Sequence, residues 1–204
     1  MNNNGDYISE DDSLKPENMI RLYANGAFPM ADESGKLDWY MPEIRTVIPL
    51  DEFNCPRSLR KFMNTSGFEY RIDSDYFSVI NSCAGRNPTW ISDQLIEAYS
   101  GLYRNGYLHS VETWLEGELV GGLYGIAVRG AFFGESMFSK VPQASKASFV
   151  KLAEHLKNQG FALIDVQYQT GHLEMFGARE ITLSEYDRLL REAYLRDCGF
   201  SKDL

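Results

Sequence analysis

The stretch from His109 to Phe138 constrains the fold more than any other, because its apolar residues recur with a period of two. Two short turns, at residues 116–118 and 129–130, divide this stretch into three segments. Alternation that is interrupted by tight turns is typical of consecutive antiparallel strands. The sequence therefore predicts a three-stranded meander in the middle of the chain.

The segments on either side of the meander predict helices and further strands. Helices are expected where apolar residues recur at helical spacing, over about 16–25, 56–63, 77–83, 92–105, 145–159 and 184–196, with a short one at 173–176. Ser92 is the expected N-cap of one helix, and Ser184 with Asp187 forms the capping pattern of the last. Further strands are expected over 39–41, 46–50, 68–72, 161–167 and 179–183. Residues 27–32 are expected to be irregular.

This succession of elements indicates an α+β domain with a mixed sheet. Its order resembles the acetyltransferase-like (GNAT) fold, although a fold alone does not give a function. Within it, an apolar strand at 131–133, a polar loop with Glu135 and Ser136, and a helix from residue 145 are expected to follow one another. Polar groups at such a junction either form a solvated turn or carry the chemistry of the domain.

Composition and charge narrow the class of protein. The 204 residues allow one medium domain, or one domain with a small appendage. Neither an apolar run of about 20 residues nor a signal-peptide pattern is present in the sequence, so we expect a cytoplasmic protein without a membrane partner. The three cysteines and three histidines are scattered, so neither a disulfide framework nor a metal site is expected.

The formal net charge of −9 argues against a nucleic-acid partner, because phosphate contacts need Lys and Arg. The acidic excess is unevenly placed, however. Glu10, Asp11 and Asp12 lie in an expected N-terminal tail over residues 1–13. Basic residues cluster at Arg57, Arg60 and Lys61, and again at Lys140, Lys146 and Lys151. A local basic patch is therefore compatible with the sequence.

Three polar residues are the candidates for chemistry. Asp165 and Gln167 alternate on one expected strand and should point to the same face, where the acid could orient the amide. They could equally serve only to bond the neighbouring backbone. If Glu135 faces the same cleft, the site has two carboxylates and an amide, a charge pattern that suits a cationic substrate.

Eight blocks in this order resemble the leucyl/phenylalanyl-tRNA–protein transferase family. They are residues 23–30 (YANGAFPM), 56–59 (PRSL), 89–91 (TWI), 109–112 (HSVE), 119–125 (LVGGLYG), 134–139 (GESMFS), 144–146 (ASK) and 163–167 (LIDVQ). The matches extend from about residue 14 to the end of the chain. Met30 departs from the Trp of some members, and Thr170-Gly171-His172 departs from the usual Thr-Pro-His.

The resemblance implies transfer of Leu, Phe or Met from an aminoacyl-tRNA to the N-terminal Arg or Lys of a protein, which marks that protein for degradation. It implies a small N-terminal domain (1–44) before a GNAT-like catalytic domain (45–204), without a cofactor. It places the proposed catalytic pair on Asp165 and Gln167. The family's pocket and positioning residues fall on Trp90, Tyr99, Leu123, Phe132 and Glu135.

The donor side chain needs an apolar slot, and the tRNA needs cations. The candidates for the slot are Met30, Trp90, Leu123, Phe132, Met137 and Phe138, each of which could equally be core, and Ser136 is a further candidate for substrate contact. Arg57, Arg60, Lys61 and Lys146 are the expected phosphate contacts. We expect a monomer.

Three alternatives stay open. A CoA-dependent N-acetyltransferase would need a glycine-rich pyrophosphate loop, whereas residues 142–147 read PQASKA. A binding module without catalysis is disfavoured because both Asp165 and Gln167 are present. A related transferase with a different donor or acceptor is harder to exclude.

Overall fold

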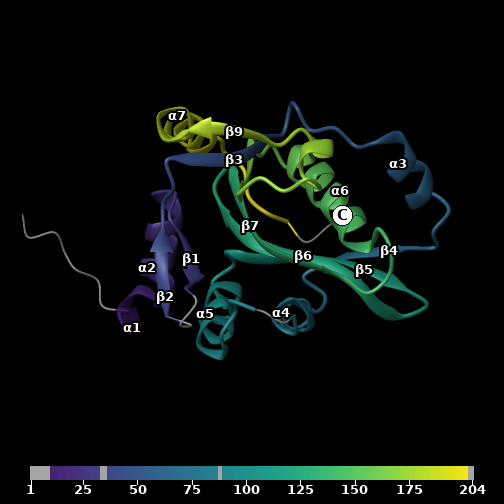
Figure 1. Cartoon of the computed structure of the whole chain (residues 1–204), viewed down its shortest axis with the longest axis horizontal. Coiled ribbons are helices and arrows are strands. Elements are labelled where there is room, and N and C mark those ends of the chain that lie inside the picture. Colours follow the sequence, from purple (N-terminus) through teal and green to yellow (C-terminus); the bar gives the residue numbers. More distant parts are fainter. Residues whose placement is uncertain (1–9, 33–35, 87–88, 202–204) are drawn as a thin grey trace, which may run out of the picture.

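A seven-stranded mixed sheet forms the centre of the molecule (Figure 1). The computed structural model describes residues 10–32, 36–86 and 89–201. The sheet has the order β4-β5-β6-β7-β8-β3-β9, in which β7 and β8 are parallel and the other neighbours antiparallel. Its strands are β3 (Ile44–Pro49), β4 (Glu69–Ile72), β5 (Leu108–Leu115), β6 (Glu118–Val128), β7 (Ala131–Ser139), β8 (Leu163–Gln167) and β9 (Arg179–Thr182). The expected α+β class and mixed sheet are confirmed.

The predicted meander is formed by β5, β6 and β7. The turn between β5 and β6 places Glu116 at φ 52° and Gly117 at φ 82°. Positive φ at both central residues is the two-residue hairpin turn whose twist matches that of the flanking strands. The local turn chemistry therefore agrees with the alternation that predicted the strands.

Helices cover both faces of the sheet. They are α1 (Glu10–Ser13), α2 (Pro16–Ala24), α3 (Arg57–Met63), α4 (Tyr76–Ala84), α5 (Asp93–Arg104), α6 (Ala144–Asn158), the short 3₁₀ helix η1 (Glu174–Phe176) and α7 (Leu183–Tyr194). Figure 1 shows α4 and α5 below the meander and α6 above it. The core is accordingly divided into two clusters, one shared by α2, α4, α5 and α7, and the other beneath α6. We call the face of the sheet that carries the first cluster the α5 face, and the face that carries the second cluster the α6 face.

The sequence predicted the N-cap of α5 correctly but not that of α7. The predicted N-cap Ser92 is confirmed, since its side chain accepts a hydrogen bond from Leu95 N. The prediction for α7 was wrong, because the helix begins at Leu183 and is capped by Thr182, whose side chain accepts from Glu185 N. Ser184 lies inside the first turn.

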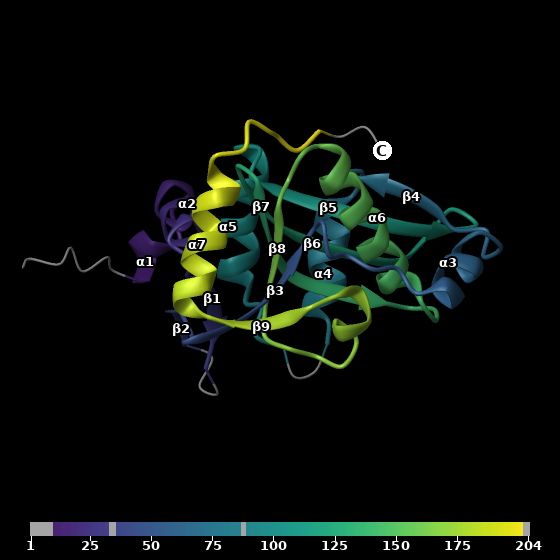
Figure 2. The same cartoon turned by 90° about the horizontal axis from the view of Figure 1, so that it is seen from above.

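The N-terminal segment packs against the α5 face. Residues 27–32 were expected to be irregular, but β1 (Phe28–Ala31) pairs with β2 (Leu37–Tyr40) in a separate two-stranded sheet, whose edges tolerate Pro29. Of the expected tail over residues 1–13, residues 1–9 lie outside the described part, whereas 10–13 form α1. Figure 2 shows α7 lying beside α2, where Tyr194 Oη donates to Ala24 O at 3.0 Å.

The two parallel strands of the sheet separate halfway along their length. β7 and β8 are in register from Ala131 opposite Leu163 to Phe133 opposite Asp165, and the pairing ends there although both strands continue. Beyond this point, β7 and β8 are therefore no longer paired with each other. The candidate site lies at this separation.

Candidate active site

Glu135 lies in a β-bulge next to the separation of the strands. Gly125 of β6 pairs with Gly134, and Tyr124 pairs with Ser136, so Glu135 is the extra residue of β7. The meander was expected to extend to Phe138, and β7 does continue through Glu135 and Ser136 to Ser139, so the polar loop also expected at these two residues is part of the strand. A side chain at Gly125 would collide with the Phe133 backbone, so glycine is required for this close approach. Bulges of this kind commonly redirect side chains at active sites.

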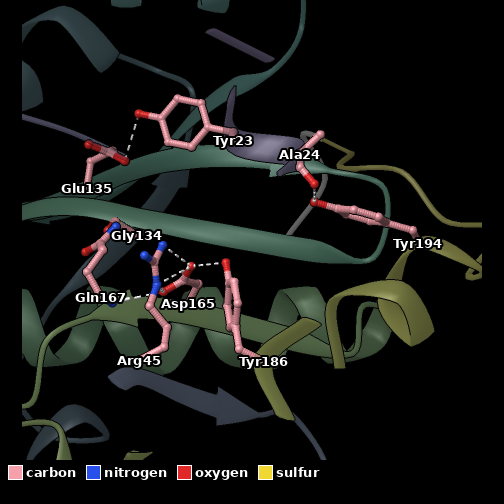
Figure 3. Close-up of polar contacts among 9 residues, drawn as sticks. All are labelled: Tyr23, Ala24, Arg45, Gly134, Glu135, Asp165, Gln167, Tyr186 and Tyr194. Carbon is pink, nitrogen blue, oxygen red and sulfur yellow. Dashed lines mark hydrogen bonds and ion pairs between the residues drawn. The ribbon is translucent and has the colours of Figure 1, made fainter. Parts of the chain in front are cut away.

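The Glu135 carboxylate is held by two buried phenols. Tyr23 Oη donates to Oε1 at 2.9 Å, and Tyr99 Oη donates to Oε2 at 2.6 Å (Figure 3 shows the Tyr23 contact). Burial raises the pKa of the Glu135 carboxyl to about 7, although the hydrogen bonds from Tyr99 and Tyr23 oppose this. Burial also raises the pKa values of both phenols well above their usual range, so they stay neutral donors. Glu135 can therefore exchange a proton or bind a cation near neutral pH.

Asp165 is completely buried in a network on the same face of the sheet. Arg45 donates Nε to Oδ1 at 2.9 Å and Nη2 to Oδ2 at 2.6 Å, and Tyr186 Oη donates to Oδ2 at 2.7 Å (Figure 3). Burial alone would lower the pKa of Arg45, but the charge and hydrogen bonds of Asp165 outweigh it and raise that pKa. Arg45 also lies 4.5 Å from the ring centroid of Phe28. The ion pair is therefore enclosed by aromatic rings.

Gln167 adopts a strained turn at the end of β8. Its φ is 60°, and Tyr168 N donates to Val166 O at 2.7 Å, which makes a γ-turn with a positive φ. Such a conformation costs a non-glycine residue about 1–3 kcal/mol and persists only when its surroundings hold it. Two bonds hold it here: Gln167 N donates to Asp165 Oδ1 at 2.9 Å, and Gln167 Nε2 donates to Gly134 O at 2.7 Å. Asp165 thus contacts the main chain of Gln167, whereas the sequence suggested that it would orient the side-chain amide.

The two candidate carboxylates face the same side. Asp165 is in register with Phe133 on β7 and with Val47 on β3, and both of these residues belong to the core cluster of the α5 face. Tyr23 and Tyr99, which bind Glu135, belong to that cluster as well. The structure therefore brings Glu135, Asp165 and Gln167 together at the separation of β7 and β8.

The six candidates for the donor slot do not share one face. Met30, Trp90 and Phe138 pack with the cluster of the α5 face, whereas Leu123, Phe132 and Met137 pack beneath α6. Phe132 is fully buried, and Leu123 is nearly so. Ser136, next to the bulge, accepts a hydrogen bond from Arg86 Nη2 at 2.5 Å. The six residues therefore do not line a single slot.

The four candidate phosphate contacts lie on α3 and α6. Arg57, Arg60 and Lys61 are exposed on α3, and Lys146 is partly exposed on α6. Arg60 is engaged in an ion pair with Glu154, which also contacts Lys151. Part of the basic cluster thus joins α3 to α6.

Sequence reasoning missed Arg45, Tyr23, Tyr186 and Arg86. Arg45 is the one charged residue of β3, which is the signal that could have identified it, because a charge in a buried strand needs a buried partner. Tyr23 and Tyr186 look like ordinary core aromatics on amphipathic helices. Their hydroxyl groups acquire a role only once distant segments are placed beside them.

Among the described residues, no group of three or more His, Cys, Asp or Glu side chains is arranged to bind a metal ion. No helix in the same residues combines the length and the apolar character needed to cross a membrane.

Solved structures identify the fold. FemX superimposes with a TM-score of 0.56 at 9% sequence identity, covering 80% of this chain and 66% of that chain. The C-terminal domain of a putative lysylphosphatidylglycerol synthetase from Agrobacterium fabrum reaches a TM-score of 0.50 at 9% identity, covering 94% and 86%. At such identities the likeness concerns the fold alone. The molecule therefore has a GNAT-like fold of the kind found in FemX.

Sequence relatives are more specific. Residues 47–191 match the model of the leucyl/phenylalanyl-tRNA protein transferase family, and residues 12–43 match its N-terminal domain. A transferase of this name from Salinibacter ruber is 45% identical over 89% of this chain and 81% of its own length. Those from Rubrobacter xylanophilus and Herpetosiphon aurantiacus are 46% and 48% identical, covering 92% and 88% of this chain and 99% and 94% of their own lengths. The chain belongs to the leucyl/phenylalanyl-tRNA–protein transferase family.

Proposed function

We propose that this aminoacyltransferase moves Leu, Phe or Met from an aminoacyl-tRNA to the N-terminal Arg or Lys of an acceptor protein in the cytoplasm, creating a degradation signal. Family membership supports the transferase reaction. The observation that carries the assignment to this site is the strained turn of Gln167, held between Asp165 and Gly134 beside the Glu135 carboxylate. A small N-terminal domain, a monomeric state and the absence of a cofactor belong to the same proposal.

The reaction asks more for positioning than for a strong base. The α-amine of the acceptor attacks the ester carbonyl, a C–N bond forms, the C–O bond to the ribose breaks, and one amine proton ends on the ribose hydroxyl. An α-amino group has a pKa of about 7.7–8.0, so on the order of a tenth is already neutral at pH 7. Orientation of the two reactants can contribute about 7–11 kcal/mol.

Gln167 is the residue that we assign to the reacting amine. Its Nε2 already donates to Gly134 O, which fixes the amide and leaves Oε1 to accept a hydrogen bond from the attacking amine. Strain in its backbone holds this side chain at the separation of β7 and β8. Asp165 supports the turn through its hydrogen bond from the main chain of Gln167.

Glu135 is the proposed contact for the cationic side chain of the acceptor. Its carboxylate points toward the α5 face, where Tyr23 and Tyr99 fix both oxygens. A carboxylate whose pKa is about 7 becomes fully charged when a guanidinium or ammonium approaches, because an opposite charge favours the ionised form. This preference would select Arg and Lys at the acceptor terminus.

We assign the remaining candidate residues to the binding of the aminoacyl-tRNA donor. We place the apolar side chain of the donor against Leu123, Phe132 and Met137, because these three candidates pack in one cluster on the α6 face, whereas Met30, Trp90 and Phe138 pack on the α5 face. Met30, Trp90, Phe138 and Ser136 then contact the nucleotide end. Arg57, Lys61 and Lys146 supply phosphate contacts, with Arg60 shared between phosphate and Glu154.

The test is transfer of labelled leucine from Leu-tRNA to a peptide that begins with Arg. We expect labelling of the free peptide, none of the N-acetylated peptide, and a loss of at least about 100-fold in Gln167→Ala. Gln169→Ala is the matched control, because this partly buried glutamine lies two residues beyond and is outside β8. Inactivity with Leu-, Phe- and Met-tRNA by well-folded protein would instead indicate a related transferase with another donor or acceptor.

A further inference from the structure

Every acceptor position of the Asp165 carboxylate is already occupied. Oδ1 accepts from Arg45 Nε and from Gln167 N, both at 2.9 Å. Oδ2 accepts from Arg45 Nη2 at 2.6 Å and from Tyr186 Oη at 2.7 Å. An ionised carboxylate has about four lone-pair sites, so none is left for a substrate. The side chain is also fully buried.

We propose that Arg45, Asp165 and Tyr186 form a positioning unit that holds the Gln167 turn, and that Asp165 takes no proton during transfer. The proposal rests on the transferase function proposed above and concerns how the same site works. Asp165 acts through one hydrogen bond to the main chain of Gln167. Arg45 and Tyr186 fix the orientation in which that bond is made.

The two partners come from opposite ends of the chain. Arg45 lies on β3, which pairs with β8 beside Asp165, and Tyr186 lies on α7. Arg45 is 1% exposed and stacks between Phe28 and Tyr186, with the guanidinium carbon 4.5 and 5.0 Å from the two ring centroids. Figure 3 shows the guanidinium beside Asp165 and close to Gln167, below Gly134. All three side chains are 1% exposed or less, so the unit lies inside the protein beside the Gln167 turn.

The decisive experiment compares Asp165→Asn with the double variant Arg45→Met/Asp165→Asn. The single variant leaves the buried Arg45 guanidinium without its counter-charge, which is strongly destabilising. The double variant removes that charge, while the asparagine carbonyl can still accept from Gln167 N. We expect the single variant to lose at least about 100-fold in kcat, and the double variant to recover at least about tenfold of this, with KM for the Arg peptide unchanged.

A matched double variant isolates the hydrogen bond. Arg45→Met/Asp165→Ala also removes the charge, but offers no acceptor to Gln167 N. It should stay as inactive as Asp165→Asn, with faster hydrogen exchange at the Gln167 amide. If both double variants are equally inactive while the asparagine variant still protects the Gln167 amide, Asp165 does more than position, and the proposal is overturned.

Hydrogen exchange also separates this proposal from the proposed function. Protection of the Gln167 amide in the wild type and in Arg45→Met/Asp165→Asn, but not in Arg45→Met/Asp165→Ala, supports the positioning unit even if no tRNA is a substrate. Equal exchange in all three proteins contradicts it whatever the activity.

A second pair tests Tyr186 on the same helix. Tyr186→Phe removes the donor to Asp165 Oδ2, whereas Tyr194→Phe removes a partly buried contact to Ala24 O from the same helix. We expect about a tenfold fall in kcat for the first variant and less than about twofold for the second, at similar thermal stability. Equal effects of the two would show that Tyr186 serves packing alone.

Discussion

The Glu135 carboxylate should make the stability of the protein decrease as the pH rises from about 4.5 to 7. Its pKa is about 7 in the folded protein, against 4.5 for an ordinary glutamate. The folded state therefore binds this proton more tightly than the unfolded state, so the stabilisation is complete below pH 4.5 and is lost as the pH passes 7. The change Glu135→Gln removes this dependence, because an amide does not titrate.

The structure sets the size of the effect. A pKa raised from 4.5 to about 7 corresponds to about 3 kcal/mol, at roughly 1.4 kcal/mol per pKa unit. Glu135 is only partly buried, and solvent screens part of this energy. We therefore expect the free energy of unfolding of Glu135→Gln, relative to the wild type, to rise by about 1–3 kcal/mol between pH 5 and pH 8.

Urea unfolding of both proteins at the two pH values measures this difference, and the groups that they share cancel. Glu154→Gln is the comparison, because burial raises the pKa of Glu154 but is outweighed by the hydrogen bond from Arg60 and the charge of Lys151, which lower it. The ionised Glu154 carboxylate stabilises the wild type, and this stabilisation is lost as the pH falls toward the lowered pKa. The free energy of unfolding of Glu154→Gln, relative to the wild type, should therefore rise as the pH falls below 5. A difference for Glu135→Gln that is flat, or that falls toward pH 8, would refute the reasoning.

Three further predictions concern other parts of the molecule. Arg57→Gln/Lys61→Gln should reduce the slope of log K for tRNA against log salt by about 1–2, measured by filter binding; an unchanged slope would exclude both residues from phosphate contact. Gly125→Ala should lower the free energy of unfolding by more than about 2 kcal/mol, because its methyl group would meet the Phe133 backbone, whereas Gly171→Ala has no neighbour to meet and should change it little in the same urea titration. Met137→Ala should alter the ratio of kcat/KM for Phe-tRNA and Leu-tRNA by about 5–50-fold, and an unaltered ratio would remove it from the donor slot.

The elements of this fold were readable from the sequence where the signal is local. The meander followed from alternation, and the N-cap Ser92 from its own hydroxyl and the helix that it begins. The strand that contains Phe28 was missed because it is short and Pro29 is a poor strand former, whereas its partner was expected over 39–41. The bulge at Glu135 was missed because a bulge exists only relative to the register of the partner strand.

The candidate site divides in the same way. Asp165, Gln167 and Glu135 were identified because they interrupt apolar strands and match a family motif. Arg45 was missed, since the reason to bury a guanidinium is a carboxylate 120 residues further along the chain. The sequence also did not reveal that the apolar candidates pack on two different faces of the sheet, because this depends on which helix covers each strand.

The network around Asp165 also affects the order in which the native structure is recovered during folding. Arg45 lies on β3, Asp165 on β8 and Tyr186 on α7, so the contacts join segments that are far apart in the sequence. Contacts of such long sequence separation cost more loop-closure entropy than local hairpins and helices do, which disfavours their early formation. Recovery of transferase activity during refolding should therefore lag behind the recovery of far-ultraviolet circular dichroism, which makes activity a reporter of the completed native state.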